Sequence, residues 1–248
     1  MAFGVMGDTP YSADQARRLD TLIDDLNGER LEFVAHVGDL GTSAQACRDD
    51  WLTARKAQLA RIRHPFVLLP GDNEWSDCHR AGADPLERLR RWRALFCNQP
   101  TGLRLERQAG EHCEHVRWRL GDALFVALNV PGNNNNARMP AEQAARMNAV
   151  LEWIDAAERL DPPTLVLLAQ ANPFVPRLGY DAFRQRLEAL ARARPGRVIL
   201  VHGDTHLYRD DEPLPGLRRI EVWGSPFVSW LRGALTPAGL QVDAARQY

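Results

Sequence analysis

The sequence predicts an α/β fold, built as one layered sandwich domain over residues 1–248. Three observations support this prediction. Strand-like and helical segments alternate in the first part of the chain, short strand-like segments fill the tail, and four apolar segments end in Gly-Asp. A content of 45% hydrophobic and 25% charged residues is typical of a globular protein that buries a proper core.

The first part of the chain alternates between buried strands and helices, as parallel strands with crossover helices do. No linker or internal repeat interrupts this pattern, and the only low-complexity run is Asn133–Asn136. We expect strands at Ala2–Met6, Leu31–Val37 and Phe66–Leu69, and helices at Ser12–Leu26, Ala44–Ile62 and Pro85–Phe96.

The second part begins with antiparallel strands and then returns to alternation. Gly121-Asp122 joins two apolar runs and is expected to be a hairpin turn. Helices are predicted at Pro140–Leu160 and Asp181–Arg194. The predicted strands are Arg104–Gln108, Val116–Leu120, Ala123–Val130, Leu165–Ala169, Val198–His202, Leu217–Val222, Phe227–Leu231 and Leu240–Val242.

Gly-Asp pairs are more frequent than composition explains. About one or two pairs are expected by chance, whereas the chain contains five. Four of them follow predicted strands, and their aspartates are Asp8, Asp39, Asp72 and Asp204. Because loops at the carboxyl ends of strands build the sites of open α/β sheets, these carboxylates should gather at one edge. Gathered carboxylates repel one another, so the pattern indicates bound metal ions.

Composition argues against several classes of partner. A net charge of −1 gives no reason to expect a nucleic-acid or membrane partner. No segment approaches membrane-spanning length, and strand-like residues begin at Ala2, so no signal peptide is expected unless one has been removed. The compartment and the oligomeric state stay open.

Four cysteines are present, namely Cys47, Cys78, Cys97 and Cys113, and they show no Cys-x-x-Cys spacing. A zinc knuckle is therefore not expected. Their even number permits disulfides without requiring them. A bridge between Cys47 and Cys78 is conceivable, because each follows shortly after a Gly-Asp loop.

The blocks at the strand ends are, in order, "GDTP", "VGDL", "PGDNEW", "LLAQANP" and "HGDTH". Their order resembles that of the calcineurin-like metallophosphoesterases, and the resemblance covers almost the whole chain. It implies an αββα sandwich, in which helices flank two mixed β-sheets, with two divalent metal ions at the strand ends.

The resemblance also implies a ligand set in which most of the family's histidines are replaced. Asn73 stands at the position of the histidine that assists catalysis, and Gln170 and Asp204 stand at positions of histidine ligands. Asp39 matches the aspartate that bridges the metals. The ligands carried over are Asp8, Asp39 and His206 for one ion, and Asp39, Asp72, Gln170 and Asp204 for the other.

The donor set and the family together suggest the chemistry. Carboxylate and amide oxygens favour Mn²⁺ or Mg²⁺, with Ca²⁺, Zn²⁺ or Fe as alternatives. The expected activity is hydrolysis of a small phosphate mono- or diester by a metal-activated hydroxide. The alternative is a non-catalytic descendant that binds metal or a phosphorylated ligand.

The candidate catalytic residues are Asp39, Asn73 and His202. The amide of Asn73 can donate a hydrogen bond but cannot deliver a proton to a leaving group. His202 or His79 would then act as the acid, unless the substrate has a good leaving group. Candidate hydrogen-bond donors to phosphate are Asn73, His202, His79, Arg80, Arg138 and the loop Asn133–Asn136.

Structural roles are expected for other notable side chains. We expect His36 to support Asp39 from the core, and His112 and His115 to be solvated in a charged hairpin. For Tyr11 and Trp75, packing under the site is favoured over stacking on a substrate.

Overall fold

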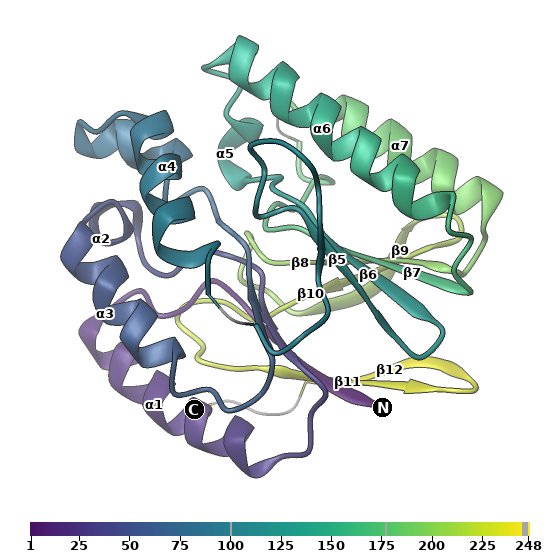
Figure 1. Ribbon diagram of the computed structural model, residues 1–248, viewed down its shortest axis with the longest axis horizontal. Coiled ribbons are helices and arrows are strands. Elements are labelled where there is room, and N and C mark those ends of the chain that lie inside the picture. The colour runs from purple at the N-terminus through teal and green to yellow at the C-terminus, as the bar shows by residue number, and fades with distance from the viewer. Residues whose placement is uncertain (100, 177, 245–247) are drawn as a thin grey trace.

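Two β-sheets pack face to face between helices in the computed structural model, which describes residues 1–99, 101–176, 178–244 and 248 (Figure 1). The predicted α/β sandwich of two mixed sheets is confirmed. Within the described residues, the first sheet has five strands and the second has seven. In spatial order, the first sheet consists of β12 (Gly239–Asp243), β11 (Leu231–Thr236), β1 (Ala2–Met6), β2 (Val34–His36) and β3 (Phe66–Leu68).

Parallel pairing links the central strands of both sheets, and antiparallel strands complete one edge of the first sheet and both edges of the second. In the first sheet β1, β2 and β3 are parallel, while β11 runs antiparallel to β1. In the second sheet β6, β7, β8 and β10 are parallel. The second sheet consists of β4 (Glu106–Arg107), β5 (Val116–Leu120), β6 (Ala123–Ala127), β7 (Thr164–Leu168), β8 (Val198–His202), β10 (Leu217–Glu221) and β9 (Arg209–Leu214).

The layer between the sheets is apolar because alternate residues of each strand point to the same face. Phe3 and Val5 of β1 belong to the same buried cluster as Val166 and Leu168 of β7. This shared core holds the two sheets in a fixed relation. The loops at their carboxyl edges therefore start from rigid positions.

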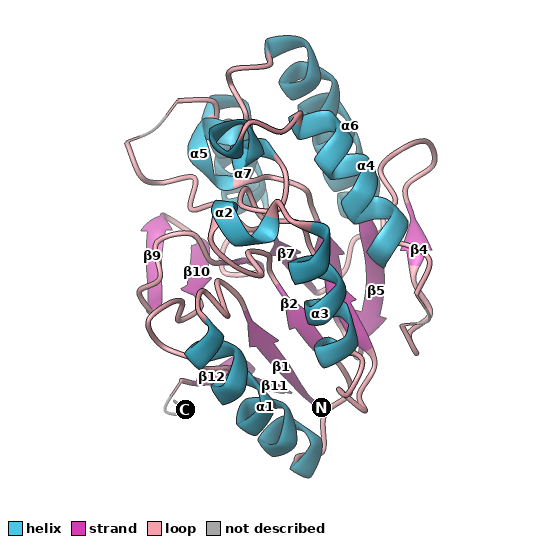
Figure 2. Ribbon diagram, turned by 90° about the vertical axis from the view of Figure 1, so that its left-hand side faces the viewer, coloured by secondary structure: helices cyan, strands magenta, loops and turns pink. Residues whose placement is uncertain are grey.

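Helices cover the outer face of each sheet (Figures 1 and 2). Leu19 and Leu22 of α1 are buried with Val34 of β2, and Ile154 of α6 is buried with Leu187 of α7 over the second sheet. In the described part of the chain, no helix is long and apolar enough to cross a membrane. The helices are α1 (Ala13–Gly28), α2 (Ser43–Ala46), α3 (Asp49–Leu59), the 3₁₀ helix η1 (Ser76–Ala81), α4 (Pro85–Phe96), α5 (Gly132–Asn135), α6 (Pro140–Glu158) and α7 (Asp181–Ala193).

The main differences from the prediction concern one helix, one strand that is absent and one strand that was not predicted. The helix predicted over Ala44–Ile62 divides into α2 and α3, because Arg48 has an extended backbone with φ −102° and ψ 136°. The strand predicted over Phe227–Leu231 is wrong, since β11 begins at Leu231. Strand β9 was not predicted because its sequence, RDDEPL, is polar and largely exposed at the sheet edge, where no apolar alternation is needed.

Two covalent links tie the loops to this frame. The conceivable bridge between Cys47 and Cys78 is present and joins the end of α2 to η1. A second disulfide joins Cys97 and Cys113. The predicted hairpin turn at Gly121-Asp122 is also confirmed, since it connects the antiparallel strands β5 and β6.

Candidate metal centre

The Gly-Asp loops of both sheets meet at one edge of the sandwich. The backbone nitrogen of Asp8, after β1, donates to the carbonyl of Gly38, after β2, at 2.9 Å. The backbone nitrogen of Asp204, after β8, lies 3.1 Å from each carboxylate oxygen of Asp8. The predicted gathering of strand-end carboxylates is therefore present, and it joins the two sheets.

Glycine recurs before these aspartates because the loops press against one another. A Cβ atom at Gly203 would lie 1.9 Å from Oδ2 of Asp8, and one at Gly71 would lie 2.0 Å from Oδ1 of Asp39. Each of these glycines thus makes room for a carboxylate of a neighbouring block. The Gly-Asp repeat is a packing requirement of the site as well as a turn signal.

His206 is oriented toward Asp8 as a cation ligand would be. Its Nδ1 atom donates to the carbonyl of Ser225 at 2.7 Å, and its Nε2 atom lies 3.7 Å from Oδ1 of Asp8. Because Nδ1 carries the proton in this arrangement, the lone pair of Nε2 is directed to the site. This is the tautomer that a metal-binding histidine needs.

Asp39 lies at the centre of a hydrogen-bond cluster. Its Oδ1 accepts from the backbone nitrogen of Asn73 at 3.0 Å. Its Oδ2 accepts from the Tyr11 hydroxyl at 2.8 Å, from Nδ2 of Asn73 at 3.0 Å and from Nε2 of Gln170 at 3.3 Å. Glu74 braces the same loop from below, accepting from the backbone nitrogens of Asp39 and Gly71 at 3.2 and 2.6 Å.

Asp72 and Asp204 converge on the backbone of Gly132. A Cβ atom at Gly132 would lie 2.7 Å from Oδ1 of Asp72 and 2.8 Å from Oδ1 of Asp204. Asp204 is further held by the backbone nitrogen of Asn172, which donates to its Oδ2 at 3.0 Å. The loop after β6 therefore forms the wall of the site beside these two carboxylates.

Left-handed backbone conformations are concentrated in and beside this site. Among the described residues, nine residues other than glycine have a positive φ, and all but Asp161 lie in these loops. Such conformations are costly and are kept where a function requires them. The eight are Asp8, Asp39, Asn133–Asn136, Asp204 and His206.

The carboxylates of this cluster are buried without compensating positive charge. Asp8, Asp39 and Asp72 are at most 8% exposed, and within the described residues none of them pairs with an arginine or lysine. Burial raises the pKa of all three carboxyls well above the usual value, and neighbouring carboxylates raise it further. Divalent cations are the natural source of the missing charge, so these residues fit a metal centre.

The candidate ligand atoms of the Gly-Asp loops lie farther apart than the atoms that coordinate a single ion. In the part of the chain that the structure describes, histidine, cysteine and acidic ligand atoms lie within 4.8 Å of one another only in two groups beside the Cys97–Cys113 disulfide. Both groups contain Glu114, whose oxygens already accept from Arg93 at 2.7 and 2.9 Å. The carboxylate that these two groups share is therefore already neutralised by an arginine, and the groups do not need a cation.

Two predicted site residues have surroundings that do not favour the roles expected for them. His202 is fully buried, and burial lowers its pKa to about 3, which favours the neutral imidazole over the protonated form that a general acid needs. Gln170 turns its amide nitrogen toward Asp39, while its oxygen accepts from the backbone of Gly132. Gln170 is therefore placed as a hydrogen-bond donor rather than as an oxygen ligand.

The candidate phosphate donors have different surroundings. The side chain of Arg80 is 57% exposed and pairs with Asp77 at 2.6 Å. Arg138 is exposed, and His79 contacts the carbonyl of Ser76 through Nδ1 at 2.8 Å. The four amides of the asparagine loop contact protein groups, namely Asp77 and Arg80 for Asn133, Leu178 for Asn134, Gly179 and Arg146 for Asn135, and Glu142 for Asn136.

Four structural expectations can be compared with the structure. His36 is buried and accepts from the backbone nitrogen of Gly38 at 3.2 Å, so its support of the Asp39 loop is confirmed. Trp75 is fully buried, as packing requires. The prediction for His115 was wrong, because this residue is fully buried. The prediction of a packing role for Tyr11 was incomplete, because its hydroxyl also donates a hydrogen bond to Asp39.

Two further residues of the site were given no role by sequence reasoning. Asp77 is 2% exposed and contacts Arg80 and Asn133, and Asn172 positions Asp204. Asn172 follows the "LLAQ" strand end, and that position marks it as a polar residue of a strand-end loop. Nothing in the sequence marks Asp77, because it lies inside η1 rather than directly after a strand.

Comparisons with known proteins find similarity in structure alone. No protein-family model and no curated protein sequence matches the chain. A dimetal phosphatase from Danio rerio superposes with a TM-score of 0.60 at 13% identity, over 96% of this chain and 93% of that one. GAP50, described as the anchor in the inner membrane complex of Plasmodium, gives a TM-score of 0.61 at 11% identity, over 100% of this chain and 87% of that one.

A purple acid phosphatase from yellow lupin superposes over 100% of this chain with a TM-score of 0.60 at 14% identity. The chain spans about half of that structure, since 52% of it is covered. These similarities agree with the two mixed sheets flanked by helices. The chain has the fold of the calcineurin-like metallophosphoesterases.

Proposed function

We propose that this chain is a metal-dependent phosphoesterase that hydrolyses small phosphate mono- or diesters. The observation that carries the proposal is the burial of Asp8, Asp39 and Asp72 without an arginine or lysine partner among the described residues. Neighbours of the same fold include a dimetal phosphatase and a purple acid phosphatase, and their names support the same reaction class.

Two divalent ions would be held by residues of both sheets. Asp8, Asp39 and His206 would bind one ion, and Asp39, Asp72 and Asp204 the other. We favour Mn²⁺ or Mg²⁺, because five of these six ligand positions offer carboxylate oxygen. Such ions supply activation of a water nucleophile and stabilisation of negative charge on the phosphoryl oxygens.

The side chains of the protein would orient the ester and balance its charge. Four aspartates roughly cancel the charge of two divalent ions, so phosphate would depend on hydrogen-bond donors. Asn73 is partly exposed beside Asp39 and can donate through Nδ2. Arg80 supplies an exposed guanidinium at the rim. With His202 neutral and Asn73 an amide, the proton for the leaving group would have to come from another donor.

Purified protein loaded with Mn²⁺ or Mg²⁺ tests the proposal, with aryl phosphate mono- and diesters as substrates. Asp39→Asn should abolish metal-dependent hydrolysis, because Asp39 is the ligand shared by both ions. The matched control is Asp14→Asn, at an exposed aspartate that pairs with Arg17 on α1. Hydrolysis that is absent in the native protein, or unchanged in Asp39→Asn, would exclude the proposed reaction.

A non-catalytic binding protein is the second candidate function. Its support is the lack of a histidine proton donor at Asn73, together with a neighbour of the same fold that is described as an anchor. Such a protein should bind inorganic phosphate only when metal is present and should turn over no ester. Calorimetry with phosphate, run beside the activity assay, separates the two candidates.

A further inference from the structure

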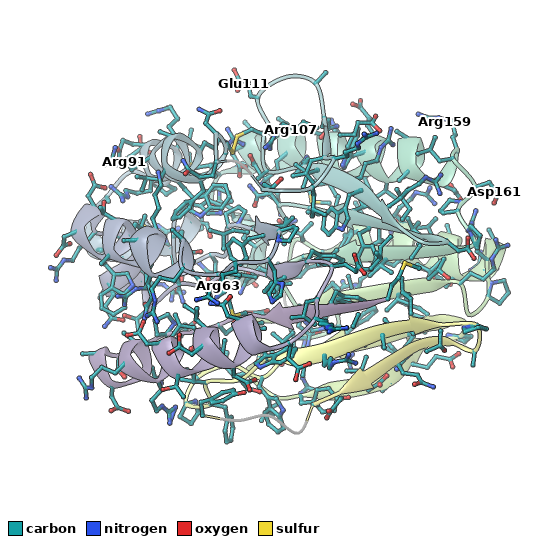
Figure 3. All side chains as sticks on the ribbon, turned by 60° about the horizontal axis from the view of Figure 1, so that its bottom comes forward. Arg63, Arg91, Arg107, Glu111, Arg159 and Asp161 are labelled. Carbon is teal, nitrogen blue, oxygen red and sulfur yellow. A yellow bond between two sulfur atoms is a disulfide. The ribbon has the colours of Figure 1, made fainter. Side chains whose placement is uncertain are left out.

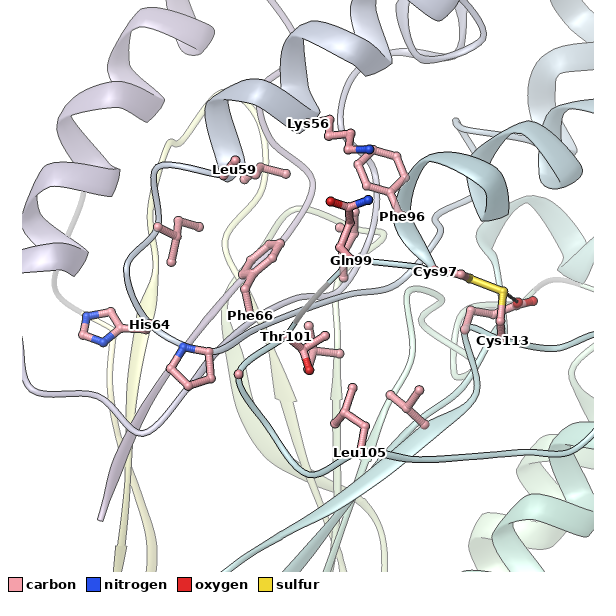
Figure 4. A pocket seen from close by; sticks show the side chains of 18 of the residues that line it. Lys56, Leu59, His64, Phe66, Phe96, Cys97, Gln99, Thr101, Leu105 and Cys113 are labelled. Carbon is pink, nitrogen blue, oxygen red and sulfur yellow. Dashed lines mark hydrogen bonds between the residues drawn. A yellow bond between two sulfur atoms is a disulfide. The ribbon is translucent and has the colours of Figure 1, made fainter.

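A cavity of about 460 Å³ opens at the edge of the sandwich, and Figure 4 shows side chains that line it. It lies between β3, the edge strand of the first sheet, and the β4–β5 side of the second, next to α3 and α4. None of its lining residues belongs to the ligand set proposed for the metal centre. Its volume falls within the range of pockets that take small molecules.

Apolar side chains form most of the wall. Phe66 and Leu68 come from β3, Leu59 from α3, Phe96 from α4 and Leu105 from the loop before β4. Phe66, Leu68 and Phe96 are only partly buried, although they pack against a core cluster of the first sheet. The cavity therefore presents apolar surface that an apolar ligand would remove from water.

The wall is held in place from several sides. The Cys97–Cys113 disulfide ties the end of α4 to the segment before β5, and both cysteines line the cavity. The backbone nitrogen of Phe66 donates to the carbonyl of Thr101 at 2.9 Å, which fixes the loop opposite α3. A cavity with tethered walls is preformed, so a ligand would lose little affinity to ordering of the protein.

The charges around the cavity are predominantly positive. Lys56 is the only lysine among the 31 basic residues of the chain, and it extends from the last turn of α3 at the top of the cavity (Figure 4). Arg63 also lines the cavity, and within the described residues neither side chain has an ion-pair partner. Glu114, the one acidic lining residue, is already neutralised by Arg93.

We propose that this cavity binds a small apolar molecule that carries one carboxylate. The apolar body would contact Phe66, Leu59 and Leu105, and the carboxylate would pair with the ammonium of Lys56. Apolar walls alone would accept any apolar ligand, whereas the unpaired cation selects an acid because an anion gains a charge-assisted hydrogen bond there. This site is separate from the metal centre and does not depend on the proposed hydrolysis.

Calorimetric titration of metal-loaded protein with octanoate and with octanamide tests the proposal. The two probes share the same apolar chain and differ in charge. Octanoate should bind about tenfold more tightly than octanamide, the difference expected from one hydrogen bond to a charged group. Equal binding of the two probes, or no binding of octanoate at millimolar concentration, would overturn the proposal.

Three variants locate the binding. Lys56→Met keeps the side-chain stem but removes the charge, so it should weaken octanoate about tenfold and leave octanamide unchanged. Arg159→Met, at a residue that Figure 3 labels at the end of α6, should change neither. Leu105→Trp should weaken both probes by filling the cavity. Octanoate binding that survives in Lys56→Met with unchanged affinity would contradict the assigned carboxylate partner.

The carboxylate of octanoate could also bind at the metal centre, and the Asp39→Asn variant distinguishes that site from the cavity. Octanoate binding in the cavity should be the same in Asp39→Asn as in the native protein, and the same with and without inorganic phosphate. Loss of octanoate binding in that variant, or competition by phosphate, would place the ligand at the metal centre and overturn the proposal. The outcome is independent of whether the chain hydrolyses esters.

Discussion

The Tyr11 hydroxyl donates to Oδ2 of Asp39 at 2.8 Å, which links the loop after β1 to the loop after β2. The ring of Tyr11 also meets the His206 ring edge-on, with centroids 5.1 Å apart. Tyr11 therefore contacts two candidate ligands at once. This contact suggests that the tyrosine positions the ligand that both ions would share.

Tyr11→Phe should keep the fold and the ring contact but release Oδ2 of Asp39. We expect the metal affinity to change and kcat/KM to fall about tenfold, since a hydrogen bond to a charged group contributes about 1.5–3 kcal/mol. Metal titration and steady-state kinetics measure the two effects. Tyr208→Phe is the control, because Tyr208 packs with Trp223 instead. Unchanged values in Tyr11→Phe would reduce Tyr11 to a packing residue.

Removal of metal should destabilise the protein, and the effect should grow with pH. The pKa values of Asp8, Asp39 and Asp72 are raised in the folded protein, so without metal their protonated forms stabilise the fold at low pH. This stability is lost as pH rises above about 4 through the raised values. Bound cations stabilise the folded state only, by mass action.

Melting temperatures with metal and with chelator, measured at several pH values, check this prediction. The difference between the two should be larger at pH 8 than at pH 5. Asp8→Asn should reduce the difference, because it removes one of the repelling charges. A constant difference over this range, after confirmed metal loss, would argue against a cluster of buried carboxylates.

Gly132→Ala should weaken metal binding. The added Cβ would lie 2.7 Å from Oδ1 of Asp72 and 2.8 Å from Oδ1 of Asp204, so these carboxylates would have to move. We expect the apparent metal affinity to fall by about tenfold or more, which metal titration followed by melting temperature would show. Gly28→Ala is the matched control, since nothing lies within 4 Å of a Cβ there. Equal metal affinity in both variants would remove Gly132 from the site.

The rate of hydrolysis should depend steeply on the leaving group, because Asn73 is an amide and cannot deliver a proton. Aryl esters should be cleaved much faster than alkyl esters. Asn73→His should help alkyl esters selectively, by up to about 10²-fold. A series of esters with graded leaving-group pKa, measured on the native protein, is the main test. A flat dependence would show that another residue supplies the proton.

Much of the fold could be predicted because local sequence patterns mark its buried strands and its helices. The buried parallel strands are continuous apolar runs, so β1, β7 and β8 were located to within one residue. Edge strands lack this signal, and β9 was missed because its residues face solvent. The break between α2 and α3 was missed because it depends on the backbone of one residue, Arg48, within an otherwise helical pattern.

The sequence by itself determined which loops carry the candidate ligands, because Gly-Asp after an apolar run marks a strand end. Only the tertiary structure decided what each side chain faces. Gln170 turns its nitrogen to Asp39 because its oxygen is needed by the backbone of Gly132, and His202 is neutral because the fold buries it. Such orientations depend on groups far apart in the chain, which no local pattern specifies.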